Sequence, residues 1–246
     1  MPDWIEHFKP FSAVHAVTVL LFALIWLLLT RTALRLRGGA REDAWRRGLA
    51  GVLLGVWLAV NGLQLLPAYY VASENLPLHP CDLVGLLAPY AIWTRRRLAY
   101  AVLYFWGIGF TLQAIITPEL NDGPGSPWFW AFWLPHAAIF GAAVYIVVVE
   151  GFVPTWRDCL RAYQVALLYL ALLVPFNLAT GFNYGYLGKA NPRTASLLDL
   201  LGPWPWRLIV LAALTALGFV LLQLPWALRA RRDPLSAELD DRRQHP

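Results

Sequence analysis

The sequence predicts an all-α, polytopic membrane protein, a seven-transmembrane helix bundle. Of its 246 residues, 59% are apolar and only 14% are charged, whereas soluble domains average about 25% charged residues. Charge-free apolar stretches recur along the chain, and a stretch of about 20 apolar residues is what crosses the hydrocarbon core of a bilayer. The basic residues stand in short blocks between these stretches, which indicates membrane topology and argues against nucleic acid as a partner.

Seven apolar stretches are long enough to span the bilayer. They lie near Phe11–Thr30, Gly48–Tyr70, Leu76–Thr94, Leu98–Thr117, Trp128–Val149, Ala162–Gly181 and Trp204–Leu228. The first stretch follows no basic segment and precedes no small-residue cleavage site, so we expect it to be a retained span and not a signal peptide. Residues 1–230 are therefore expected to form one transmembrane domain, and residues 231–246 a disordered cytoplasmic tail.

The Lys and Arg residues predict the orientation. Sixteen of the 20 lie in residues 31–47, 95–97 and 157–161 and at the C-terminal end, segments that fall on alternate sides of the predicted spans. The remaining sides hold only Lys9, Lys189, Arg193 and Arg207. Because cytoplasmic loops carry an excess of basic residues, we expect the N-terminus outside and the C-terminus in the cytoplasm.

Six polar side chains share one depth in the predicted bundle. A rise of about 1.5 Å per residue, counted from each span's cytoplasmic end, places them in the outer third of a core about 30 Å thick. They are His15, Asn61, Cys81, Gln113, His136 and Asn177, and the outer loops add Glu119, Asn183, Tyr184, Tyr186 and Asp199 above them. Because a polar side chain that faces lipid is costly, we expect this layer to surround a shared cavity.

Cys81 and His136 are the candidate catalytic residues of this layer. Cys81 is its only thiol, and a nearby imidazole could accept the thiol proton to form a nucleophilic thiolate. His79 is a second candidate base, but two residues on a helix separate it from Cys81 by about 200° around the axis. His136 is therefore the preferred base.

Three further side chains could support the reaction. Asp82 could orient a histidine or bind a polar headgroup, and a carboxylate within a span indicates a functional site by default. Gln113, Asn61 or an N-terminal amide of the third span could supply an oxyanion hole for a tetrahedral acyl intermediate. Amide side chains in membranes also commonly join helices, which is the structural interpretation of the same residues.

Two other interpretations stay open. His79, Cys81, Asp82 and His136 are all permissible zinc ligands, and a zinc-bound water would hydrolyse an ester, although the sequence has no compact zinc motif. A non-enzymatic transporter or lipid-binding protein could use the same cavity, although no pair of broken helices in matching halves supports transport.

Four strings carry a family resemblance. They are Leu76–Leu83, Tyr104–Ala114 continuing to Leu120, Asn183–Leu187 and Ser196–Trp206. Together they resemble the YwaF-like family of bacterial integral membrane proteins, which is remotely similar to the eukaryotic transmembrane protein 164 acyltransferase. The resemblance implies a multi-pass protein of the bacterial inner membrane, and transfer of an acyl chain to a lyso-lipid by a cysteine and a histidine. Cys81 and His136 look like the matching positions.

The function predicted from the sequence is acyl transfer or acyl hydrolysis on a membrane phospholipid or lysophospholipid. Cys81 would attack the ester to form a thioester, and His136 would take the thiol proton and return it to the leaving hydroxyl. This chemistry requires no cofactor and no metal, and its partner is the bilayer itself.

Overall fold

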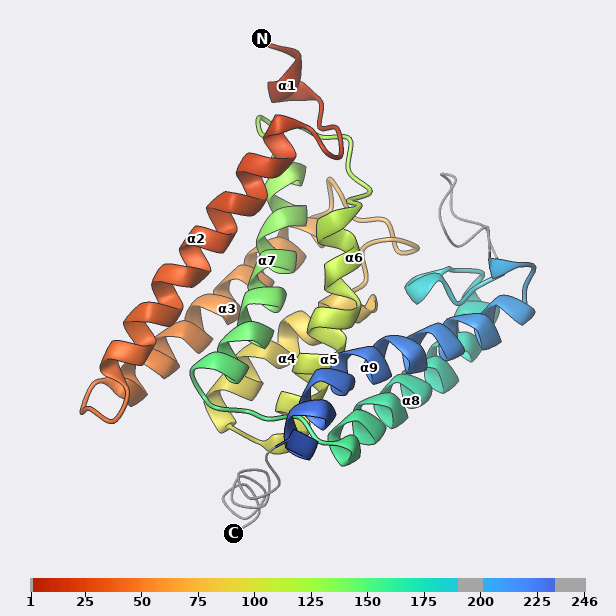
Figure 1. The fold of residues 1–246 in the computed structure, drawn as a ribbon. Coiled ribbons are helices and arrows are strands. Elements are labelled where there is room, and N and C mark those ends of the chain that lie inside the picture. The colour runs from red at the N-terminus through yellow and green to blue at the C-terminus, as the bar shows by residue number, and fades with distance from the viewer. Residues whose placement is uncertain (1, 190–200, 233–246) are drawn as a thin grey trace. The chain divides into compact units, whose positions relative to one another are not determined.

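The computed structural model describes residues 2–189 and 201–232, and its secondary structure there is helical (Figure 1). The helices are α1 Asp3–Glu6, α2 Ala13–Leu36, α3 Glu42–Gln64, α4 Pro80–Thr94, α5 Arg97–Gly109, α6 Thr111–Ile116, α7 Pro127–Val148, α8 Trp156–Thr180, the 3₁₀ turn η1 Tyr184–Tyr186 and α9 Trp206–Arg232. The chain divides into two compact units, Met1–Gly151 and Phe152–Pro246, which we describe one at a time.

The core of the first unit lies between α4, α5 and α7, which pack against one another. Helix α5 is its centre, because every residue from Ala99 to Gly107 is buried. A Cβ on Gly107 would lie 3.3 Å from both Ala143 and Ile139 of α7, so the glycine allows the two helices to approach closely. Helix α3 packs against α4, and α2 packs against α3 and α7.

The N-terminal segment joins the start of α2 to the start of α7. The Phe8 amide donates to the Asn121 carbonyl at 2.8 Å, and His7 forms an isolated antiparallel bridge with Asp122. The Phe8 ring then packs with Phe129 and Trp133 in a buried aromatic cluster. These contacts gather the ends of α2, α6 and α7 at one end of the unit.

The second unit is built on the pair α8 and α9. Thr155 and Asp158 form a capping box that starts α8, with the Thr155 amide donating to Asp158 Oδ2 at 2.8 Å. The Tyr163 hydroxyl of α8 donates to the Ala212 carbonyl of α9 at 3.2 Å, and Gln223 Nε2 donates to the Pro154 carbonyl at 3.0 Å. Polar side chains therefore join α9 to the first turns of α8 and to the segment just before it.

Five helical segments in the described part of the chain are long and apolar enough to cross a membrane. They are α2, the α5–α6 segment Arg97–Ile116, α7, α8 and α9 up to Ala230. Helix α4 has 15 residues, or about 22 Å at 1.5 Å per residue, which is shorter than a bilayer core of about 30 Å. Helix α3 is long enough, but Glu42, Asp43 and Arg46 lie in its first turns. The multi-pass membrane prediction is confirmed, whereas the count of seven and the orientation stay predictions.

The helix boundaries correct the predicted spans in three places. The third segment becomes helical only at Pro80, because the His79–Asp82 capping box starts α4 there, four residues after the predicted start. The fourth is broken at Phe110 into α5 and α6. The sixth begins at Trp156, six residues before the predicted start at Ala162. Cys81 and Cys159 are both free thiols, and the predicted disordered tail lies outside the described residues apart from its first two positions.

Candidate functional site

Cys81 lies in the first turn of α4, directly after the residues that start the helix. His79 is the N-cap and Pro80 the first helical residue, where a proline's missing amide hydrogen is not needed. The His79 amide donates to Asp82 Oδ2 at 3.0 Å, and the indole Nε1 of Trp57 donates to the Asp82 carbonyl at 2.8 Å. The Asp82 carboxylate thus caps α4, and α3 fixes the turn that carries the partly buried Cys81.

Two contacts fix the register between α4 and α7. A Cβ on Gly85 would lie 3.6 Å from Ile139 Cδ1, and at the far ends of the two helices Arg95 Nε lies 2.7 Å from Glu150 Oε2. In both contacts the α7-side residue follows its α4-side partner by nearly the same number of positions. Ile139 comes 54 positions after Gly85, and Glu150 comes 55 positions after Arg95. The helices are therefore parallel, and the same offset from Cys81 gives residues 135–136.

The register predicts that Cys81 and His136 lie at one level of the two helices. Cys81 precedes Gly85 by four residues and His136 precedes Ile139 by three, and positions three or four apart share a helix face. At a rise of 1.5 Å per residue, Cys81 lies about 6 Å and His136 about 4.5 Å from the level of the Gly85–Ile139 contact, both toward the N-terminal ends of their helices. Cys81 and His136 therefore lie on neighbouring helices at matching height.

His136 has one nitrogen engaged and one available. Its Nδ1 lies 2.6 Å from the Phe132 carbonyl, and its ring stacks on that of Phe132 with centroids 4.5 Å apart. A carbonyl only accepts, so Nδ1 carries the hydrogen, and Nε2 of the neutral ring has the lone pair. Among the residues described, no partner occupies Nε2. The hydrogen bond from Nδ1 to the backbone thus leaves Nε2, the atom that a general base would use, with its lone pair available.

Thr111 is a buried polar residue that the sequence analysis did not single out. It is the first residue of α6, just after the break at Phe110, and only 1% of it is exposed. Its hydroxyl has no hydrogen-bond partner in the described part of the chain. The string Tyr104–Ala114 contained Thr111, but a lone threonine in an apolar span carries no signal of its own.

Asn61 presents a second buried polar atom in the same region. Its Nδ2 donates to the Trp57 carbonyl at 2.9 Å, one helical turn from the indole that holds Asp82. Its Oδ1 is buried and, within the described residues, accepts no hydrogen bond. Such a group is costly unless water or a ligand satisfies it. The placement of Asn61 at the site stays a prediction.

Two members of the predicted polar layer do not contribute free groups to the site. The Gln113 side chain is exposed, which does not favour its predicted place in an oxyanion hole. His15 is buried, its Nδ1 accepts from the Phe11 amide, and its Nε2 donates to the Ile115 carbonyl, both at 2.9 Å. Both nitrogens of His15 are therefore engaged, and the bond of Nε2 joins α2 to α6.

The remaining predicted site residues belong to the second unit or lie outside the described chain. Asn177 Nδ2 donates to the Tyr184 carbonyl at 2.8 Å and Asn177 Oδ1 accepts from the Tyr184 amide at 3.0 Å, a reciprocal pair that fixes η1 to α8. Asn183 Oδ1 accepts from the Gly188 amide at 2.9 Å, and Tyr186 is partly exposed. Asp199 lies outside the described residues.

The zinc interpretation has no structural support. Across residues 2–189 and 201–232, no three His, Cys, Asp or Glu side chains come together closely enough to hold a metal ion. His79 and Asp82, two of the four ligands considered, form the capping box of α4.

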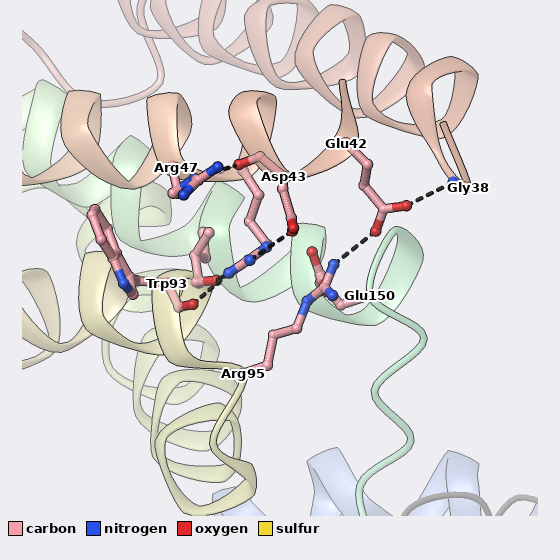
Figure 2. A network of polar contacts seen from close by, with 9 residues as sticks. Gly38, Glu42, Asp43, Arg47, Trp93, Arg95 and Glu150 are labelled. Carbon is pink, nitrogen blue, oxygen red and sulfur yellow. Dashed lines mark hydrogen bonds and ion pairs between the residues drawn. The ribbon is translucent and has the colours of Figure 1, made fainter. Parts of the chain in front are cut away.

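A charged cluster lies at the other end of the first unit (Figure 2). Arg95 bridges Glu42 at the start of α3 and Glu150 just after α7, each at 2.7 Å, while Arg46 pairs with Asp43 at 2.8 Å and donates to the Trp93 carbonyl. A cavity of about 310 Å³ opens among these side chains, lined by Arg37, Glu42, Arg95, Tyr100, Val149 and Glu150. The cluster therefore joins the start of α3 and the connection between α4 and α5 to the end of α7.

The comparison with protein families decides the relationship. The model of the TMEM164 family matches residues 7–223, which cover most of both units. The chain belongs to the TMEM164 family. No curated protein and no solved structure matches it. Membership in the TMEM164 family confirms the predicted kinship to transmembrane protein 164 and suggests a function connected with membrane lipids. The narrower assignment to a YwaF-like bacterial group stays a prediction.

Proposed function

We propose that this member of the TMEM164 family is a lipid acyltransferase or acyl hydrolase that works through a Cys–His pair. The observation that carries the proposal is the register of α4 and α7, which supports Cys81 and His136 as neighbours at one height. The proposal includes a seven-span bundle in a bacterial inner membrane, with α3 and α4 as the two spans additional to the five apolar segments.

The reaction would run in two steps at Cys81. In the first, His136 Nε2 takes the thiol proton, the sulfur attacks the ester carbonyl of a phospholipid, and the C–O bond breaks. The proton passes from His136 to the departing alkoxide, which leaves as the hydroxyl of a lysophospholipid. In the second, an acceptor hydroxyl or a water attacks the thioester and regenerates the thiol. A lysophospholipid acceptor gives transfer, and water gives hydrolysis.

The surroundings of the pair favour this chemistry. The Nδ1–Phe132 hydrogen bond directs the His136 lone pair to Nε2, and the capping box holds the turn that carries Cys81. The buried, unsatisfied Oδ1 of Asn61 and hydroxyl of Thr111 are polar groups whose partners a bound headgroup or water would supply. A lipid ester brings its own acyl chain, so the proposed reaction needs no soluble cofactor.

The test is acyl labelling of purified protein in lipid–detergent micelles. Wild-type protein is incubated with a phospholipid whose acyl chain bears an alkyne tag, and the protein adduct is detected before and after hydroxylamine, which cleaves thioesters. We expect a hydroxylamine-sensitive adduct that is absent in Cys81→Ala and at least about 100-fold weaker in His136→Ala, the contribution of a general base. Cys159→Ala, which removes the other thiol, serves as the matched control and should label like wild type.

Equal labelling of Cys81→Ala and wild type would reject the thioester mechanism. No labelling of folded wild-type protein across donor lipids would move the proposal to its alternative, a transporter or lipid-binding protein that uses the same polar groups.

A further inference from the structure

The proposed reaction does not use the cavity of about 310 Å³ in the charged cluster of the first unit. Cys81 lies in the first turn of α4 and Arg95 is the C-cap of the same helix, so about 21 Å of helix separates the cavity from the thiol. The cavity volume is at the lower end of the range for small-molecule sites, about 300–1,000 Å³. Five of its six lining residues have polar side chains, so the space suits a polar group of modest size.

The cavity lies where three apolar segments end. Helix α2 ends one residue before Arg37, α7 ends two residues before Glu150, and the α5–α6 segment begins two residues after Arg95. Because the headgroups of a bilayer lie directly outside its hydrocarbon core, the lining side chains stand at the depth of the lipid phosphates. This placement holds for either orientation of the chain in the membrane.

One arginine of the lining is left for a ligand. Arg95 pairs with both Glu42 and Glu150, each at 2.7 Å, so a single guanidinium engages the two carboxylates of the cavity (Figure 2). Arg37 has no hydrogen-bond or ion-pair partner among the described residues. A Cβ on Gly151 would lie 3.7 Å from Arg37 Nη2, which places the guanidinium beside the chain that leaves α7.

The charge around the cavity favours an anion. Residues 35–47, residues 95–97 and Glu150 together hold eight arginines and three acidic residues, a net charge of +5. Basic segments at the membrane surface attract anionic lipids. An apolar surface also lies beside the cavity, because Val144 and Val148 are exposed and share one face of the last turns of α7. A lipid with its phosphate in the cavity could lay an acyl chain there.

We propose that this cavity binds the phosphate of an anionic phospholipid, with the guanidinium of Arg37 as its main partner. A phosphodiester carries one negative charge, and the planar fork of an arginine can donate two parallel hydrogen bonds to its oxygens. The inference goes beyond the proposed function and does not depend on it, because the bound lipid stays intact and lies at the end of α4 opposite Cys81. Its role would be to join the end of α2 to the end of α7.

Thermal unfolding with added lipid tests the proposal. Full-length protein in detergent micelles is titrated with phosphatidylglycerol, whose headgroup has one negative charge, and separately with zwitterionic phosphatidylcholine. A ligand that binds the folded protein raises the unfolding midpoint in a concentration-dependent way, which yields a dissociation constant. We expect phosphatidylglycerol to raise the midpoint more than phosphatidylcholine does. Arg37→Gln should weaken phosphatidylglycerol binding about tenfold, the loss of a hydrogen bond between charged groups.

Arg35→Gln is the matched control. Arg35 is also exposed and lies in the last turn of α2, but it does not line the cavity, so its removal changes the net charge equally and should leave the dissociation constant unchanged. Because Arg37 has no partner among the described residues, Arg37→Gln without lipid should unfold at the wild-type midpoint. Arg37→Lys keeps the charge but not the fork, and should bind the lipid with intermediate affinity.

A further titration with inorganic phosphate distinguishes the source of the phosphate. If millimolar phosphate stabilises wild type, but not Arg37→Gln, as strongly as phosphatidylglycerol does, the site binds a free phosphate and the lipid is rejected as its ligand. Equal responses to phosphatidylglycerol and phosphatidylcholine, or equal affinities in wild type and Arg37→Gln, would overturn the proposal. Equal weakening in Arg35→Gln and Arg37→Gln would also overturn it, because the lipid would then respond only to the overall basic surface.

Discussion

Arg95 Nε lies 2.7 Å from Glu150 Oε2, and this ion pair joins the end of α4 to the end of α7. The Glu150 side chain is only 7% exposed, whereas that of Arg95 is 42% exposed. The same guanidinium reaches Glu42 of α3 at 2.7 Å (Figure 2). One arginine therefore holds three helices at the end of the unit opposite Cys81.

Removal of this arginine should destabilise the first unit. Arg95→Ala leaves the buried Glu150 carboxylate without its partner, and we expect a loss of about 2 kcal/mol, below the 3–5 kcal/mol of a fully buried pair because Arg95 is partly exposed. Thermal unfolding of the purified protein in detergent measures the effect. The exposed neighbour Arg96→Ala is the control, and equal midpoints for the two variants would contradict the bridging role.

The pH dependence of stability should report on Glu42. The Gly38 amide donates to its Oε2 at 2.6 Å and Arg95 to its Oε1 at 2.7 Å, and these bonds hold the pKa of Glu42 below its ordinary value of 4.5. A carboxyl whose pKa is lower in the folded state adds stability above the unfolded pKa and loses it as the pH falls through the folded pKa. The unfolding midpoint should therefore decrease below pH 4.5 in wild type, and less steeply in Glu42→Gln.

Glu119→Gln, at an exposed position, is the matched charge control for this titration. If Glu119→Gln reduces the fall of the unfolding midpoint below pH 4.5 as much as Glu42→Gln does, that fall reflects overall charge and not the contacts of Glu42.

Gly85 should tolerate no side chain. An alanine Cβ there would lie 2.9 Å from Cδ1 of Trp57, whose indole is already held by its bond to the Asp82 carbonyl. We expect Gly85→Ala to cost about 1–3 kcal/mol, because the close contact forces α3 and α4 apart. Gly55→Ala on α3, where nothing lies within 4 Å of the new Cβ, should instead raise stability by up to about 1 kcal/mol. A neutral Gly85→Ala would mean that the helices adjust freely.

The sequence located the helices better than it located their ends. Apolar length and the basic blocks predicted seven segments, and a helix occupies each of them, because burial of backbone polar groups leaves few alternatives in a membrane. The start of α4 at Pro80 and the break at Phe110 were not predicted. The first depends on the capping box of His79 and Asp82, which apolar length does not reveal.

The candidate site itself stays a prediction. Depth counting proposed Cys81 and His136 at one level, and the contacts of Gly85 and Arg95 support the same level by an independent route. Depth alone gave no information on which polar groups were already occupied. Both nitrogens of His15 are hydrogen-bonded to backbone groups, while the buried hydroxyl of Thr111 has no hydrogen-bond partner among the described residues. Those differences arise from local geometry that residue type does not encode.

Asn177 should be essential to the second unit. Asn177→Ala removes both bonds to the Tyr184 backbone at a fully buried position, and we expect a loss of about 2–4 kcal/mol from two unsatisfied groups. Limited proteolysis after Thr180 should accelerate together with the fall in the unfolding midpoint. Leu172→Ala, at a side chain 67% exposed on α8, should change neither. A stable Asn177→Ala protein would show that η1 does not depend on this pair.

Substitutions of Asp82 can distinguish a role in capping α4 from a role of its negative charge in the reaction. Its Oδ2 accepts from the His79 amide at 3.0 Å, a bond that the side-chain oxygen of asparagine can also accept. If Asp82 acts only by capping α4, Asp82→Asn should keep the unfolding midpoint and the acyl labelling of wild type, while Asp82→Ala should lose about 1 kcal/mol. If its charge orients His136 or a headgroup, Asp82→Asn will fold normally and label poorly. The contacts of Asp82 favour the first result, because its capping bond and its carbonyl's bond to Trp57 both fix the turn before Cys81 and neither requires a negative charge.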